Sequence, residues 1–139
     1  SDVYKRQDTD GHDFEVLRGA EQTIRKQEPV VLFECDSFLN KNYLEDALQI
    51  NRMMLDSGYQ NFLVYENKGH LLTRIRSVDE EAFSDLLQYQ LNSKFGYYDL
   101  LYLPERHFEE FAAEEKKFFA ARGALAGEDE IRHLSKKGI

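Results

Sequence analysis

One stretch near the start of the chain constrains the fold more than any other. Residues 8–11, Asp-Thr-Asp-Gly, place two carboxylates and a glycine directly before a segment with helical spacing, and the apolar run 30–35 follows that segment. In an open α/β sheet, ligands bind at the carboxyl ends of strands, just before the next helix. The order of turn, helix and strand therefore predicts an α/β fold with a site at this turn. Glu34 and Asp36, at the end of the apolar run, would add two further carboxylates.

The composition limits the possible functions. A chain of 139 residues is long enough for one domain with a modest core. Its net charge of -8 argues against a nucleic-acid-binding surface, which usually carries a basic patch. No apolar run approaches the roughly 20 residues that span a membrane. The sequence thus predicts a protein with neither nucleic acid nor membrane as partner, and it specifies no oligomeric state.

Cys35 is the one cysteine of the chain, so an internal disulfide is excluded. This agrees with a reducing, cytoplasmic location. Because Cys35 lies at the end of an apolar run, we expect a small buried hydrophobe rather than a nucleophile. No cysteine and histidine spacing indicates a zinc site.

Hydrophobic spacing predicts the remaining elements in chain order. Residues 13–27 form one helix, with Phe14, Leu17 and Ile24 at helical spacing and Pro29 after its end. The continuous apolar run 30–35 is typical of a central parallel strand buried on both faces. Then follow a helix over 43–57, a hairpin over 60–75 with its turn at 67–69, a helix over 78–92 and a strand over 97–103.

The last part of the chain, residues 105–122, has the pattern of a charged amphipathic helix. Its aromatic residues are expected to cover part of the body: Phe108, Phe111, Phe118 and Phe119. Gly123 and Gly127 are expected to end the helix, because glycine disfavours helix interiors. Residues 128–139 are polar and are expected to be loose.

The stretch 8–20 and the strand after it resemble a known enzyme family. Asp-Thr-Asp-Gly-His-Asp-x-Glu-Val-Leu-x-Gly-Ala, followed by an apolar strand ending in Phe-Glu, is similar to the FkbM-type family of S-adenosylmethionine-dependent methyltransferases. The likeness covers residues 8–104 and departs at Asp10, where the family usually has Glu. It implies the C-terminal half of a Rossmann-like class I methyltransferase: a partial, mixed sheet whose antiparallel last strand inserts between its two predecessors, with helices on both faces. Residues 105–139 would form a terminal helix and tail.

Residues 1–7 do not fit that family. An apolar strand is expected before the turn, but residues 4–7 read Tyr-Lys-Arg-Gln, and three long polar side chains cannot line a strand buried on both faces. The run also resembles translated sequencing-adapter DNA, so we expect a non-native leader with native sequence from Asp8. The glycine-rich loop that holds S-adenosylmethionine in class I methyltransferases has no counterpart here. The resemblance thus implies an upstream cofactor half and a fragment that is inactive alone.

Residue chemistry and the resemblance together assign roles at this site. Methyl transfer needs a positioned nucleophile and often a base for its proton. Asp8 and Asp10 are the first catalytic candidates, with Asp8 also at the edge of the cofactor; the alternative is that both cap the following helix. His12 is the third catalytic candidate, against the alternative of an exposed loop histidine. Glu34 and Asp36 are expected to bind the acceptor, although Glu34 could instead pair with a buried donor.

The resemblance implies O-methylation of a sugar or other hydroxylated small molecule or glycan, with no metal ligand. Two other functions stay open. Asp8 and Asp10 could be the metal-binding Asp-x-Asp of a nucleotide-sugar glycosyltransferase. The chain could also be a non-catalytic interaction module that uses its acidic surface and its last helix. A calcium loop is excluded, because alignment on Gly11 puts Arg6 and Leu17 where acids are required.

Overall fold

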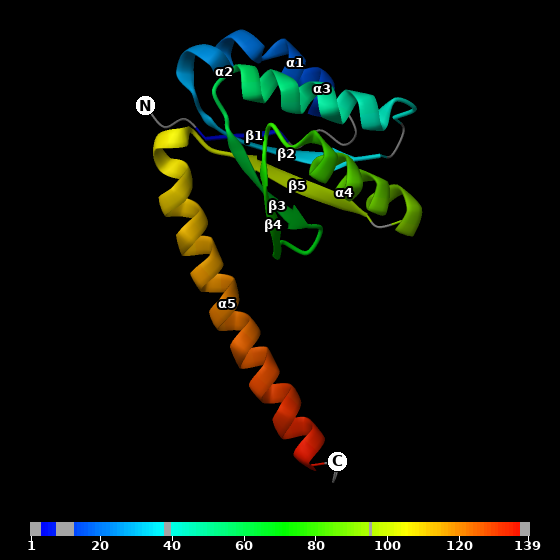
Figure 1. Ribbon diagram of the computed structural model, residues 1–139, viewed down its shortest axis with the longest axis vertical. Coiled ribbons are helices and arrows are strands. Elements are labelled where there is room, and N and C mark those ends of the chain that lie inside the picture. Colours follow the sequence, from blue (N-terminus) through cyan, green and yellow to red (C-terminus); the bar gives the residue numbers. More distant parts are fainter. Residues whose placement is uncertain (1–3, 8–12, 38–39, 95, 137–139) are drawn as a thin grey trace.

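The computed structural model describes residues 4–7, 13–37, 40–94 and 96–136, and it shows an α/β fold built on one open sheet (Figure 1). The strands are β1 (Tyr4–Gln7), β2 (Val30–Asp36), β3 (Asn61–Glu66), β4 (Leu71–Arg76) and β5 (Tyr97–Tyr102). The helices are α1 (Asp13–Gly19), α2 (Glu21–Gln27), α3 (Tyr43–Asp56), α4 (Glu80–Ser93) and α5 (Glu105–Lys136). No helix in the described part of the chain is both long and apolar enough to cross a bilayer.

The sheet has the strand order β1-β2-β5-β3-β4. Strand β1 pairs with β2 in parallel. The other three pairs, β2 with β5, β5 with β3 and β3 with β4, are antiparallel. The last strand, β5, runs antiparallel to both of its neighbours, which confirms the expected antiparallel last strand of a mixed sheet. It lies between β2 and β3 rather than between its two predecessors β3 and β4, because those two strands pair directly with each other as a hairpin. The hairpin of β3 and β4 is also confirmed, with Gly69 at a positive φ of 87° in its turn.

Residues 4–7 form β1, an edge strand parallel to β2. One prediction about the first two strands is wrong. Strand β2 is not buried on both faces, because its residues alternate between buried and half-buried. Whether residues 1–7 are native stays a prediction.

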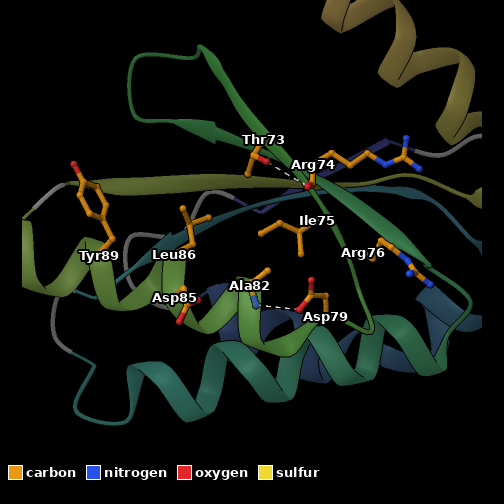
Figure 2. Close-up of a pocket in the computed structure, with 9 residues that line it drawn as sticks. All are labelled: Thr73, Arg74, Ile75, Arg76, Asp79, Ala82, Asp85, Leu86 and Tyr89. Carbon is orange, nitrogen blue, oxygen red and sulfur yellow. Dashed lines mark hydrogen bonds between the residues drawn. The ribbon is translucent and has the colours of Figure 1, made fainter.

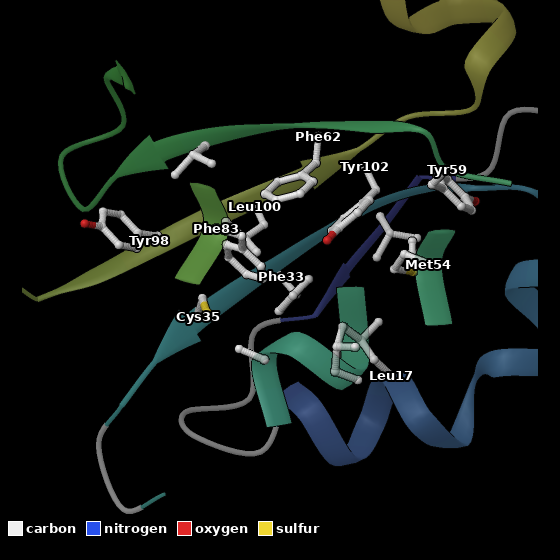
Figure 3. Packing of buried hydrophobic residues seen from close by; sticks show 14 of the residues in the cluster. Leu17, Phe33, Cys35, Met54, Tyr59, Phe62, Phe83, Tyr98, Leu100 and Tyr102 are labelled. Atoms are coloured by element: carbon white, nitrogen blue, oxygen red, sulfur yellow. The ribbon is translucent and has the colours of Figure 1, made fainter. Parts of the chain in front are cut away.

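Helices α1 to α4 pack on one face of the sheet over an aromatic core (Figures 1 and 3). Phe62 of β3 lies at its centre, with its ring centroid 5.1 Å from that of Phe83 and 4.8 Å from that of Tyr102. Helix α5 packs on the other face, where Phe108 is fully buried beside Leu63 and Leu101. The expectation of helices on both faces is therefore confirmed, with four helices on one side and α5 on the other.

Two helix predictions need correction. The expected single helix over 13–27 divides into α1 and α2 at Ala20, whose φ of -96° and ψ of 4° lie outside the helical range, directly after the helix-weakening Gly19. Conversely, α5 does not end near Gly123 but continues to Lys136. The glycines are flanked by alanines and long charged residues, whose high helix propensity offsets a cost of about 1 kcal/mol per glycine.

Candidate functional site

The candidate site lies where the parallel strands β1 and β2 end. Gln7, the last residue of β1, is paired with Phe33 of β2, so β1 ends level with the residue before Glu34. Asp8, Asp10 and His12, the predicted catalytic residues, follow this strand in sequence but lie outside the described residues. Their geometry is therefore untested. The described part of the site consists of the acceptor-binding candidates and their neighbours on β5 and β3.

Glu34 and Asp36 alternate with buried residues and are half-buried on the α5 face of β2. Glu34 is paired with Asp99 of β5, and Asp99 is paired in turn with Tyr65 of β3. Directly opposite residues of an antiparallel pair have Cβ atoms about 4.5–5.5 Å apart. The register therefore brings two carboxylates and a tyrosine into one row across three strands, near the carboxyl end of β2.

Asp99 is a site residue that the sequence reasoning missed. A signal for it was present, because an acid interrupts the otherwise apolar strand 97–103. The strand order, which the sequence reasoning did not predict, places the first residues of this strand beside the last residues of β2. The acid alone could have marked Asp99 as a candidate, and the observed register pairs it with Glu34.

Helix α5 closes one side of this row. The Tyr65 hydroxyl donates a 2.5 Å hydrogen bond to Glu115 Oε1 of α5. Burial is the main cause that raises the pKa of Tyr65, and the hydrogen bond to Glu115 adds to it, so the hydroxyl keeps its proton and acts as a donor. Between α5 and the sheet lies a groove of about 390 Å³, lined by apolar residues of β2 and β5 and by Asp99 and Glu115.

A buried hydrogen-bond network fixes the end of β2 from the opposite face. The Gln90 amide Nε2 of α4 donates to the carbonyl oxygens of Cys35 and Gly96, each at 3.0 Å. The Tyr43 hydroxyl of α3 donates to Gln90 Oε1 and lies 3.0 Å from Cys35 Sγ, so the thiol can donate to the phenol oxygen. Burial, with Cys35 as a further cause, raises the pKa of Tyr43. The network thus ties β2 to α3, α4 and the start of β5.

Cys35 is buried within this network, with none of its surface exposed. Its thiol contacts the Tyr43 hydroxyl rather than solvent, so the thiol is not accessible to a substrate, as a catalytic nucleophile must be. This confirms the prediction of a buried structural cysteine.

The paired carboxylates of Glu34 and Asp99 offer hydrogen-bond acceptors from two neighbouring strands. Ionised carboxylates are hydrogen-bond acceptors only, and a pair such as Glu34 and Asp99 can receive two hydroxyl donors of one polyol. Within the described residues, no group of three or more His, Cys, Asp or Glu side chains lies close enough to hold a metal ion. This observation does not extend to Asp8 and Asp10.

Gly19 does not show the close backbone approach that is typical of a class I nucleotide cradle. In class I nucleotide sites, glycines permit close approach of the backbone to the ligand. A Cβ placed on Gly19, the described glycine nearest in sequence to the turn, meets no other atom within 4 Å, so this glycine is not enforced by a close backbone approach.

Comparison of the chain with protein-family models, with curated proteins and with solved structures gives no match.

Proposed function

We propose that this chain is the acceptor-binding part of an S-adenosylmethionine-dependent methyltransferase that acts on an oxygen of a sugar or other hydroxylated molecule in the cytoplasm. One observation carries the proposal: the carboxylates of Glu34 and Asp99 lie opposite each other where β2 ends, level with the end of the parallel strand β1. The sequence continues from β1 directly into Asp8 and Asp10, the expected base and its neighbour.

The roles follow from carboxylate chemistry. Glu34 and Asp99 would accept hydrogen bonds from two hydroxyl groups of the acceptor and so fix its orientation. Asp8 or Asp10 would take the proton of the reacting hydroxyl, which makes that oxygen a better nucleophile. Helix α5 and Tyr65 would limit the acceptor on one side. The cofactor would be held by a segment outside this chain, so the chain alone should show no turnover.

The first test concerns the source gene. We expect the coding sequence upstream of codon 8 to contain an apolar strand followed by a glycine-rich loop, in frame with Asp8. A protein that includes this segment should bind S-adenosylhomocysteine in calorimetry, whereas the chain of 139 residues should not. A continuous native frame without such a loop contradicts the proposal, as does methyl transfer by the short chain.

The second test concerns the acceptor site in the extended protein. Glu34→Gln and Asp99→Asn should lower kcat/KM for labelled methyl transfer at least 10-fold, because each removes a charged acceptor of a substrate hydroxyl. Glu45→Gln, an exposed carboxylate on α3, is the matched control and should leave kcat/KM unchanged. Unfolding midpoints equal to that of the parent show that the variants are folded. Binding of manganese and a nucleoside diphosphate without S-adenosylhomocysteine would favour the glycosyltransferase instead.

A further inference from the structure

Strand β4 forms an edge of the sheet that is independent of the candidate site. It is the last strand in the order β1-β2-β5-β3-β4 and pairs only with β3 among the described strands. One side of its backbone therefore presents N–H and C=O groups that no described strand uses, which is a template for another extended chain.

A groove runs along this edge, between β4 and α4 (Figure 2). Its volume is about 430 Å³. One wall is four consecutive residues of β4, 73–76; the other is one face of α4 and its cap, formed by Asp79, Ala82, Asp85, Leu86 and Tyr89. Four strand residues span about 13 Å and the helical stretch 79–89 about 15 Å, so the two walls match in length. A groove of this size accepts about four residues of extended peptide.

The centre of the groove is apolar, and further apolar residues are exposed at its ends. Ile75 points from β4 toward α4, where Leu86 and Ala82 form the facing surface (Figure 2). Tyr89 is 59% exposed at one end of the groove, and Val78, directly before the helix cap Asp79, is 60% exposed. Such apolar surface beside an unpaired strand edge is the arrangement used in β-strand addition, where main-chain bonds give affinity and pockets select alternate side chains.

Charge on the two faces of β4 selects the kind of peptide. Arg74 and Arg76 alternate with the inward Ile75 and so belong to the α5 face. Arg74 forms an ion pair with Glu109 of α5 at 2.6 Å, whereas no ion pair of Arg76 is found among the described residues. On the groove side, Asp79 and Asp85 disfavour an acidic side chain. An added strand should therefore carry apolar side chains toward α4 and acidic side chains toward Arg76.

We propose that the β4 edge and its groove bind an extended segment of another protein in which apolar and acidic residues alternate. The segment pairs with the backbone of β4, its apolar side chains enter the groove against Ile75 and Leu86, and its carboxylates lie beside Arg76. A second copy of this chain is a poor occupant, because antiparallel pairing of two β4 strands would bring the arginines of both copies together.

The test uses the full chain and a short capped peptide of alternating valine and glutamate, labelled for fluorescence anisotropy. We expect saturable binding, and amide shifts in NMR spectra confined to β4, its turn and α4. Arg76→Glu and Tyr89→Lys should each weaken binding about 10-fold, because they remove the charge partner and the apolar margin. A valine and lysine peptide should bind poorly to the parent chain and recover affinity for Arg76→Glu.

Matched controls lie away from the groove. Phe118→Lys on α5 replaces an aromatic residue that is 51% exposed, and Arg25→Glu on α2 reverses an exposed charge. Both should bind the valine and glutamate peptide as the parent does. The proposal is overturned if the peptide does not bind at millimolar concentration, if the groove and control variants weaken binding equally, or if sedimentation shows a dimer that Arg76→Glu dissociates.

Discussion

The two faces of the sheet are built differently. On the face covered by α1 to α4, large aromatic residues are in mutual ring contact and fully buried, with Phe62, Phe83 and Tyr102 at 0–1% exposure. On the face covered by α5, the buried cluster is smaller, and Val30 and Leu32 of β2 are only half-buried. Phe111 of α5 is 37% exposed beside the groove of about 390 Å³.

This difference indicates that one face mainly stabilises the fold and the other carries the candidate site. Because burial of apolar area is the main source of folding free energy, the face covered by α1 to α4 should supply most of the stability. The α5 face carries the row of Glu34, Asp99 and Tyr65, where polar groups meet a surface that is incompletely filled. Two changes of the same kind, one on each face, should therefore have different consequences.

The largest expected effect comes from removing an aromatic ring on each face. Phe62→Ala should lower the free energy of unfolding by about 3–5 kcal/mol, because a fully buried ring in contact with two others leaves a cavity. Phe108→Ala should cost less global stability, since it anchors one helix to a sheet that stays packed on its other face. Urea unfolding gives the two free energies.

Hydrogen exchange separates the two variants further. In Phe108→Ala, amides of α5 should lose protection while those of β3 and β5 keep it, because the helix can detach as a local unit. In Phe62→Ala, protection should fall throughout the sheet. Equal global losses in both variants would show that the two faces contribute alike.

The second effect concerns the hydrogen bonds that hold the end of β2 from the face covered by α1 to α4. Gln90→Leu should destabilise the fold by about 1–3 kcal/mol, because it leaves the buried carbonyl of Cys35 and the Tyr43 hydroxyl without their amide partner. Gln88→Leu, on the exposed side of α4, has the same change in chemistry and should stay within about 0.5 kcal/mol of the parent. Thermal unfolding of both variants measures the difference.

The same network shows what the sequence could predict. Apart from β1 and the division of α1 from α2, element type and order followed from periodicity, because apolar spacing reflects the face that each helix or strand buries. The hydrogen bonds among Tyr43, Cys35 and Gln90 could not be predicted from periodicity, because they join three elements whose side-chain positions depend on the final packing. Gln90 looks like any surface glutamine of an amphipathic helix, yet it is only 1% exposed.

Glycines were poor predictors of where a helix ends. Gly19 precedes the division of α1 from α2, whereas Gly123 lies inside α5 without ending it. Intrinsic propensity is a weak prior that neighbouring residues and packing decide. The candidate site was predicted in part: Glu34 and Asp36 lie at the end of β2 as expected, and Asp99 was found only through the register.

The smallest expected effect compares one ion pair on each face, through its dependence on pH. Arg52 of α3 donates two hydrogen bonds to Glu80 of α4, and Arg74 of β4 donates two to Glu109 of α5. These bonds are the main cause that lowers the pKa of each glutamate from its usual value of 4.5. A lowered folded-state pKa stabilises the fold above the unfolded pKa, and this stabilisation disappears as the pH falls through the folded value.

Glu80→Gln should therefore be less stable than the parent at pH 7, by no more than about 1 kcal/mol because the pair is partly exposed, and the difference should shrink below about pH 4.5. Glu109→Gln should show the same sign and a smaller change, since Glu109 is 68% exposed and Glu80 39%. Urea unfolding at several pH values, with and without added salt, measures both. A larger loss for Glu109→Gln would mean that α5 is held to the sheet more by charge than by Phe108, and the contrast between the two faces would then lie in the type of contact rather than its strength.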